Sequence, residues 1–196
     1  MEAVIKFKPE RLFPIRLLPH PRFCIASDAA LEQPKATTGG FLIIWLDGEQ
    51  ESREGFVADI PPALYDWLTP GDYKIAQLEL IQVLFALCTR ASQFRGRRGY
   101  WYIDNIAALM SLIRGRSLTP DLERLSHLIH IILFALQVWI YWEWIPSKSN
   151  WSDAISRLGF KDPWYQRQGF SPHSAFIELG LLDLPFPAVL SIFRFL

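Results

Sequence analysis

Residues 22–58, RFCIASDAALEQPKATTGGFLIIWLDGEQESREGFVA, contain the pattern that decides the fold. Two strand-like runs, 41–46 and 52–58, flank the dipeptide DG, which is a typical hairpin turn. A shorter apolar run, 22–27, precedes them across a polar stretch. Three consecutive strands joined in this way predict an antiparallel meander.

Downstream of a proline-rich loop at 60–72, helical and strand patterns alternate. We predict helices at 74–91, 105–113, 120–136 and 151–157, and strands at 100–103 and 138–145. Asp72, Thr119 and Asn150 are the expected N-caps of three of these helices. Strands separated by helices favour parallel pairing with right-handed crossovers. The expected fold is therefore α/β, with a mixed five-stranded sheet of three antiparallel and then parallel strands, and helices on both faces.

The ends of the chain differ from its middle. Residues 1–21 contain four prolines, which indicates an extended lead-in or linker. We expect one domain over residues 22–158. Residues 159–196 are predicted to be a C-terminal extension that is irregular apart from a last helix.

Composition excludes several classes of protein. Of the 196 residues, 51% are hydrophobic, which excludes disorder, and 20 basic residues balance 20 acidic ones, so any site for a polyanion must be local. Cys24 and Cys88 lie in apolar runs and are expected to be reduced, which suits an intracellular protein. Residues 125–142 lack charged side chains, but polar residues interrupt them, so a buried helix and strand are expected and no membrane contact.

Four acidic residues fall at related places in this topology. Asp28 is expected to end the first strand, Glu79 lies on the long helix, Asp104 ends the fourth strand, and Asp153 opens the helix after the fifth. Ligands of open α/β sheets bind at the carboxyl ends of the parallel strands, so these side chains are predicted to converge. Converging carboxylates repel one another unless a cation neutralises them, and hard oxygen ligands suit Mg²⁺ or Mn²⁺.

Four segments together resemble the ribonuclease H domain of reverse transcriptases, above all those of retrotransposons and related retroelements. They read SDA, AQLELIQVLFAL, WYIDNIAAL and WIPSKSNWSDAISR, and the resemblance covers about residues 22–158. It implies hydrolysis of the RNA strand of an RNA–DNA hybrid, assisted by two Mg²⁺ ions, with Mn²⁺ as a substitute. It also implies a polymerase domain in the same polyprotein.

The resemblance gives each acidic residue a role. Asp28 would bridge the two metal ions, Glu79 and Asp104 would hold one side, and Asp153 the other. Glu79 would also help to position the ribose 2′-OH, which distinguishes RNA from DNA.

Other residues are candidate contacts to the substrate. They are Gly39, Gly40, Asn105, Lys148, Asn150, Arg95, Arg97 and Arg98. The three arginines lie in a loop before an aromatic strand, where they would either track the hybrid backbone or form an ordinary solvated loop. Many members of the family carry a His where this sequence has Lys148, which bears on the rate of turnover more than on metal binding.

Each acidic residue also has an ordinary structural explanation. Asp28 would suit a turn after a strand, Glu79 a solvated helix face, Asp104 a helix cap, and Asp153 a helix N-terminus that favours acids. Two other functions therefore stay open at this point. One is a catalytically weak or inactive ribonuclease H-like module of a retroelement polyprotein, against which the four intact acids argue but for which Lys148 and the hydrophobic tail leave room. The other is a related nuclease such as an exonuclease or an integrase.

Overall fold

The structure, a computed structural model, describes residues 21–30, 38–69 and 74–195. The predicted lead-in, apart from Pro21, and the predicted cap Asp72 lie outside the described residues.

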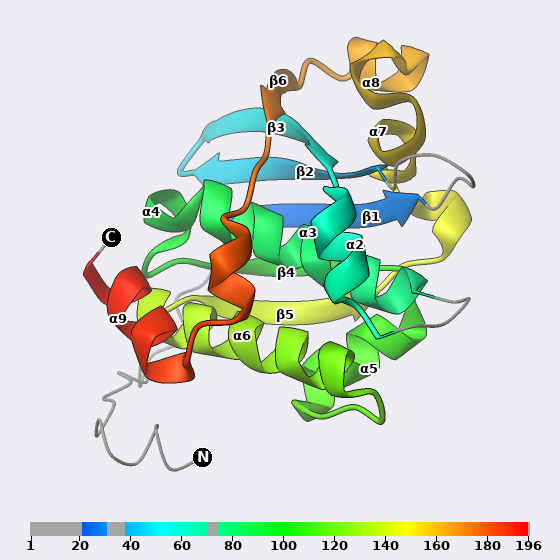
Figure 1. The fold of residues 1–196 in the computed structure, drawn as a ribbon. Helices are drawn as coiled ribbons and strands as arrows, with labels where there is room; N and C mark the ends of the chain where they lie inside the picture. The colour runs from blue at the N-terminus through cyan, green and yellow to red at the C-terminus, as the bar shows by residue number, and fades with distance from the viewer. Residues whose placement is uncertain (1–20, 31–37, 70–73, 196) are drawn as a thin grey trace.

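A single mixed sheet organises the chain (Figure 1). Its strands are β1 Phe23–Ala30, β2 Thr38–Asp47, β3 Gln50–Asp59, β4 Arg98–Ile103, β5 Trp139–Trp144 and β6 Ser171–Ser174. They lie in the order β5-β4-β1-β2-β3-β6, with β1, β2 and β3 antiparallel and the β1–β4, β4–β5 and β3–β6 pairs parallel. The predicted fold class is confirmed, and a sixth strand extends the sheet.

The three-stranded meander forms as the sequence predicts, with one change at Asp28. The hairpin between β2 and β3 turns at Gly48, whose φ of 68° suits glycine. Strand β1 runs on to Ala30, because Asp28 and Ala29 still pair with Gly40 and Gly39 of β2. Asp28 therefore lies inside β1. The prediction that Asp28 ends the first strand is wrong.

Close packing against β2 explains the two glycines that precede its apolar run. A Cβ atom on Gly39 would lie 2.1 Å from Nε2 of Gln82, and one on Gly40 would lie 2.7 Å from Cγ2 of Ile155. A helix therefore packs on each glycine from opposite faces of the strand. Both residues belong to β2, although the sequence suggested a polar loop here.

Helices cover both faces of the sheet. The helices are α2 Pro62–Trp67, α3 Ile75–Thr89, α4 Ala91–Phe94, α5 Ile106–Arg114, α6 Pro120–Leu136, α7 Asp153–Leu158, α8 Pro163–Arg167 and α9 Phe186–Phe195, with short 3-10 helices η1 Ser147–Ser149, η2 Gly159–Lys161 and η3 Leu179–Leu182. Helices α3 and α6 lie over one face, whereas α7 and α8 pack against the other (Figure 1). Because α3 lies between the sheet and α6, every one of its residues from Gln77 to Leu87 is buried.

Two predictions about helices need correction. The proline-rich loop contains α2, which begins with Pro62 at a position where proline is tolerated and which buries Leu64. Helix α7 begins at Asp153 with Ser152 as its N-cap, two residues later than expected, and Asn150 is not its cap.

The uncharged run 125–142 divides between α6 and β5, as expected. None of the helices in the described residues has both the length and the apolar character that crossing a membrane requires.

The C-terminal extension is more ordered than the sequence suggested. Strand β6 pairs with β3, and its His173 stacks on Phe56 with ring centroids 5.0 Å apart. Helix α9 packs on α6, and Arg124 of α6 donates to the carbonyl oxygens of Leu182 and Leu184. These segments thus extend the sheet and its helical layer.

The substitution Gly40→Ala should lower the free energy of unfolding by about 1–3 kcal/mol, because the new methyl group would press on Ile155 and on the backbone oxygen of Phe56. Urea unfolding followed by circular dichroism measures this change. Gly180→Ala is the matched control, since nothing lies within 4 Å of its Cβ position. Equal stability of the two variants would contradict the packing described here.

Candidate functional site

Three acidic side chains meet at the carboxyl edge of the parallel strands. Asp28 comes from β1, Asp104 follows β4, and Glu79 reaches over from α3. One carboxylate oxygen from each lies within 4.8 Å of the others. Asp28 is 5% exposed and Glu79 only 1%. Together with Asp153, the three line a cavity of about 370 Å³.

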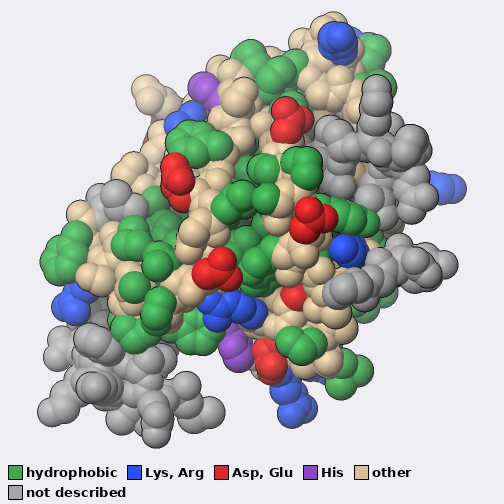
Figure 2. Space-filling view, viewed as in Figure 1, with side chains coloured by type: hydrophobic (Ala, Val, Ile, Leu, Met, Phe, Trp, Pro, Cys, Tyr) green, Lys and Arg blue, Asp and Glu red, His purple; other side chains and the backbone are tan. Residues whose placement is uncertain are grey.

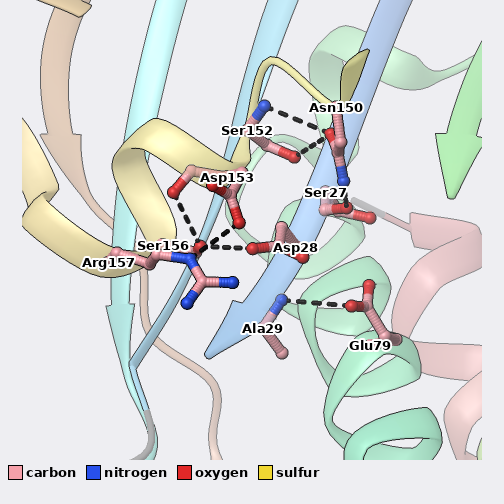
Figure 3. A network of polar contacts seen from close by, with 9 residues as sticks. All are labelled: Ser27, Asp28, Ala29, Glu79, Asn150, Ser152, Asp153, Ser156 and Arg157. Carbon is pink, nitrogen blue, oxygen red and sulfur yellow. Dashed lines mark hydrogen bonds and ion pairs between the residues drawn. The ribbon is translucent and has the colours of Figure 1, made fainter. Parts of the chain in front are cut away.

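The end of β1 is held between a helix on each side (Figure 3). From α7, the hydroxyl of Ser156 donates a short hydrogen bond to Oδ2 of Asp28. From the other side, Oε1 of Glu79 accepts a hydrogen bond of 3.3 Å from the backbone N–H of Ala29, the next residue of β1. The end of β1 is thus fixed to both covering layers.

Burial changes the acidity of the Asp28 and Glu79 carboxyl groups. The pKa of Asp28 is raised from 3.8 to about 6: burial is the largest cause, the hydrogen bond from Ser156 opposes it, and the charges of Asp104 and Asp153 add to it. Burial also raises the pKa of Glu79 well above its usual value, and the neighbouring charges of Asp28 and Asp104 add to this effect. A low-dielectric site that is crowded with carboxyl groups favours their protonated forms unless a cation is bound.

Asp153 completes the cavity from the side of the sheet covered by α7 and α8. It is the first residue of α7, and its Oδ1 accepts a hydrogen bond of 2.8 Å from Nε of Arg157, one turn later. Both side chains are partly exposed and line the cavity. One turn of α7 therefore presents Asp153, Ser156 and Arg157 to the acidic cluster.

A buried asparagine fixes the segment that leads into α7. Nδ2 of Asn150 donates to the carbonyl oxygen of Ser27, and its Oδ1 accepts from both the N–H and the hydroxyl of Ser152. On the other face of β1, Nε1 of Trp101 donates to the hydroxyl of Ser27. Asn150 is 5% exposed, so it anchors the chain next to Asp28 and does not point towards solvent as a substrate contact would.

The remaining candidate contacts divide into two groups. Asn105 lines the cavity, where its side chain also caps α5 by accepting from the N–H of Ala108. This hydrogen bond makes Asn105, and not Asp104, the cap of α5. Lys148 is exposed in η1, beside Ser147, which lines the cavity. Gly39 and Gly40, by contrast, are covered by protein side chains.

The structure does not bring the arginine loop to the acidic cavity. Arg98 begins β4 and Asp104 follows its end, a distance of about 20 Å at roughly 3.3 Å per residue. Arg95 donates to the carbonyl oxygens of Ala135 and Phe193, and Arg97 pairs with Asp47 at 2.8 Å.

Basic side chains also do not form a continuous patch among the described residues on the face with α3 and α6 (Figure 2). There they are scattered among hydrophobic and acidic ones.

Sequence reasoning missed Ser156 and Arg157. Both lie in the quoted segment WIPSKSNWSDAISR, three and four residues after Asp153. In a helix this spacing places side chains on one face, which is the signal that could have found them.

The carboxylate set suits a hard divalent cation. Oε2 of Glu79 is buried without a hydrogen-bond partner among the described residues. A buried carboxylate oxygen of this kind costs free energy unless a cation or a proton satisfies it. All the candidate ligands are oxygens, as Mg²⁺ and Mn²⁺ prefer. The residues therefore fit a divalent metal centre.

Comparison with a solved structure supports this fold. Neither a protein-family model nor a curated protein sequence matches this chain. The solved RNase H1 of the halophilic archaeon Halobacterium salinarum aligns with 72% of this chain and 98% of its own, at a TM-score of 0.51 and 18% identity. The N-terminal RNase H domain of a Mycobacterium tuberculosis protein, solved as a fusion with maltose-binding protein, aligns with 76% of this chain and 99% of its own, at a TM-score of 0.49 and 15% identity. The likeness to the archaeal protein shows that this chain has the RNase H-like fold.

Without metal, the advantage in stability of Asp28→Asn over the wild type should grow as the pH rises from about 4 to about 6. In this window the folded wild type keeps a proton on Asp28 that the unfolded chain releases, so its free energy of unfolding falls with pH. The shift corresponds to about 3 kcal/mol at pH 7, and Asn does not titrate.

Thermal unfolding in EDTA between pH 4 and pH 8 measures the difference. A constant difference across this range would contradict the raised pKa of Asp28. Added Mg²⁺ should stabilise the wild type above pH 6 and the variant much less, because the metal requires the ionised carboxylate.

Proposed function

We propose that the chain is a metal-dependent ribonuclease H-type endonuclease that hydrolyses the RNA strand of RNA–DNA hybrids. The observation that carries this proposal is the convergence of Asp28, Glu79 and Asp104 within 4.8 Å, in one cavity with Asp153, at the carboxyl edge of an RNase H-like sheet. Each acid comes from a different element, so a purely local explanation of each one leaves their meeting unexplained.

The four carboxylates would hold two Mg²⁺ ions, or Mn²⁺ in their place. Bound there, the metal supplies an activated water and neutralises the charge that develops on the phosphate. Asp28 lies between the two sides of the site and would contact both ions. Glu79 and Asp104 would bind on the α3 side, and Asp153 on the α7 side.

The residues around the carboxylates orient the substrate. Asn105 lines the cavity with the acids, and Lys148 follows Ser147, which also lines it, so an amide and an ammonium group there would contact the sugar–phosphate backbone. Glu79, at the buried end of the cavity, would help to place the ribose 2′-OH. These contacts would favour RNA in the strand that is cut.

The proposed biological context is a retroelement reverse transcriptase. Its support is the sequence segment WIPSKSNWSDAISR together with the three other segments that resemble those enzymes. In this proposal residues 22–158 form the nuclease domain, residues 1–21 the connection to a polymerase domain, and residues 159–196 an extension that packs on the nuclease.

Cleavage of a labelled RNA–DNA hybrid in Mg²⁺ tests the function. We expect the RNA strand to be cut, with little cutting of single-stranded RNA or duplex DNA and none in EDTA. Asp28→Asn and Asp104→Asn should abolish cleavage while they keep the fold, because each removes one charge from a repelling cluster.

Equal cutting of all three substrates would rule out hybrid specificity. Hybrid binding without any cleavage would favour the alternative of an inactive module.

A separate prediction concerns Lys148. Lysine, whose usual pKa is about 10.4, stays charged at neutral pH, whereas histidine at about 6.5 accepts and releases protons there. Lys148→His should therefore raise turnover between about pH 6 and 8, within the roughly 10²–10⁴-fold range of acid–base assistance. Lys148→Ala should keep measurable activity. Steady-state rates at saturating hybrid check both variants, and a Lys148→Ala enzyme as inactive as Asp28→Asn would make Lys148 essential.

A further inference from the structure

Ser156 is a buried polar residue in the wall of the candidate site. It lies three residues after Asp153 on α7 and is only 1% exposed. Helix α7 packs across β1 and β2, so the side chain of Ser156 faces the end of β1. A hydroxyl at such a position costs free energy unless it forms hydrogen bonds.

The hydrogen bonds of Ser156 join two carboxylate-bearing segments. Its Oγ contacts Oδ2 of Asp28 on β1 and lies 3.1 Å from the backbone oxygen of Asp153 (Figure 3). A hydroxyl has a single proton, which it donates to one of these oxygens at a time. Towards an ionised Asp28 this donation is charge-assisted, which makes it the stronger of the two.

Contact at Oδ2 restricts how the carboxyl group of Asp28 can turn. The terminal torsion of an Asp side chain is broad, so packing alone leaves its plane poorly defined. A donor held rigidly by α7 fixes Oδ2 and with it the direction of Oδ1. The same contact sets the position of α7, and hence of Asp153, relative to β1.

We propose that Ser156 is a positioning residue of the metal centre, which orients Asp28 and keeps Asp153 in register with it. This inference rests on the proposed function, since it assigns a role to Ser156 in that same site. Ser156 touches neither the substrate nor the metal in this role. Residues that hold a metal ligand by a hydrogen bond typically contribute about 10–100-fold to metal affinity.

A second serine supplies a matched control. Ser152, the N-cap of α7, is equally buried, and its hydroxyl donates to Asn150 and not to a carboxylate. Ser152→Ala and Ser156→Ala therefore both remove a buried hydroxyl from the same helix. Only the second removes a contact to a carboxylate of the site.

The first experiment is calorimetric titration of the full chain with Mn²⁺ alone, in the absence of nucleic acid, at a temperature where circular dichroism shows each variant folded. Ser156→Ala should bind Mn²⁺ about 10-fold or more weakly than the wild type. Ser152→Ala should lower the melting temperature and bind Mn²⁺ within about twofold of the wild type, since it leaves Asp28 in place. Wild-type Mn²⁺ affinity in Ser156→Ala would overturn the inference, as would an equal loss in both variants.

Kinetics with hybrid substrate give a second readout. In Ser156→Ala, kcat should fall at low Mn²⁺ and recover as Mn²⁺ is raised, with the KM for hybrid unchanged because Ser156 is buried. Ser156→Thr, which keeps the hydroxyl, should restore most of the Mn²⁺ affinity. If Ser156→Ala does not fold, Ser156→Cys replaces it, because a thiol is a weak donor of similar size, and it should show an intermediate loss of affinity.

The inference and the proposed function fail in different ways. A wild-type chain that binds Mn²⁺ but does not cut the hybrid ends the proposed function, while the comparison of affinities still decides the role of Ser156. A chain that cuts the hybrid, with the same Mn²⁺ affinity in Ser156→Ala, ends the inference alone. A wild-type chain that binds no Mn²⁺ overturns both.

Discussion

Repulsion among buried carboxylates is the constraint on which this structure depends. Asp28, Glu79 and Asp104 bring their oxygens within 4.8 Å of one another, and two unit charges at that separation repel by about 3.5 kcal/mol at an effective dielectric constant of about 20. Nearly complete burial of Asp28 and Glu79 adds the cost of removing each charge from water. A chain keeps such a cluster only if the rest of the fold is stable enough to hold it. The large core of aromatic and aliphatic side chains between the sheet and α3 and α6 supplies that stability.

The alternation of side chains along β1 separates the site from the core. Ser27 faces the helical layer and receives a hydrogen bond from Trp101, whereas Asp28 faces α7 and receives one from Ser156. Asn150 ties the segment before α7 to the backbone of the same strand. Two consecutive residues of β1 therefore link the core to the site, so that the position of the carboxylate is set by the strand that also packs into the buried core.

Much of this arrangement could be predicted from the sequence because it is encoded locally. The hairpin around Gly48, the buried helix α3 and the acids near strand ends all have short-range signals, and the pairing of the first five strands follows from the connections between them. The contacts that cross the molecule could not be predicted in this way. Nothing in the sequence near Asn150 indicates that its partner is the carbonyl oxygen of Ser27, 123 residues away.

The arginine loop is a second case in which the sequence does not predict long-range contacts. Its three arginines are close to Asp104 in the sequence, but β4 separates them from it in space. Their partners, including Asp47 and the backbone near the C-terminus, are set by the tertiary structure. The short segment that forms β6, SPHS, has no apolar alternation and includes a proline, so only the open edge of β3 makes it a strand.

The pairing of β6 with β3 determines where the chain can be truncated. Without β6, the backbone N–H and C=O groups along the outer side of β3 from Glu54 to Val57 would face solvent. An uncovered strand edge is a template for pairing with another chain and hence for aggregation. The stacking of His173 on Phe56 and the docking of α9 on α6 keep this cover in place. A fragment that ends at residue 158 would thus retain all four carboxylates but would expose the edge of β3 to pairing with other chains. The smallest fragment that covers this edge includes the segment through β6.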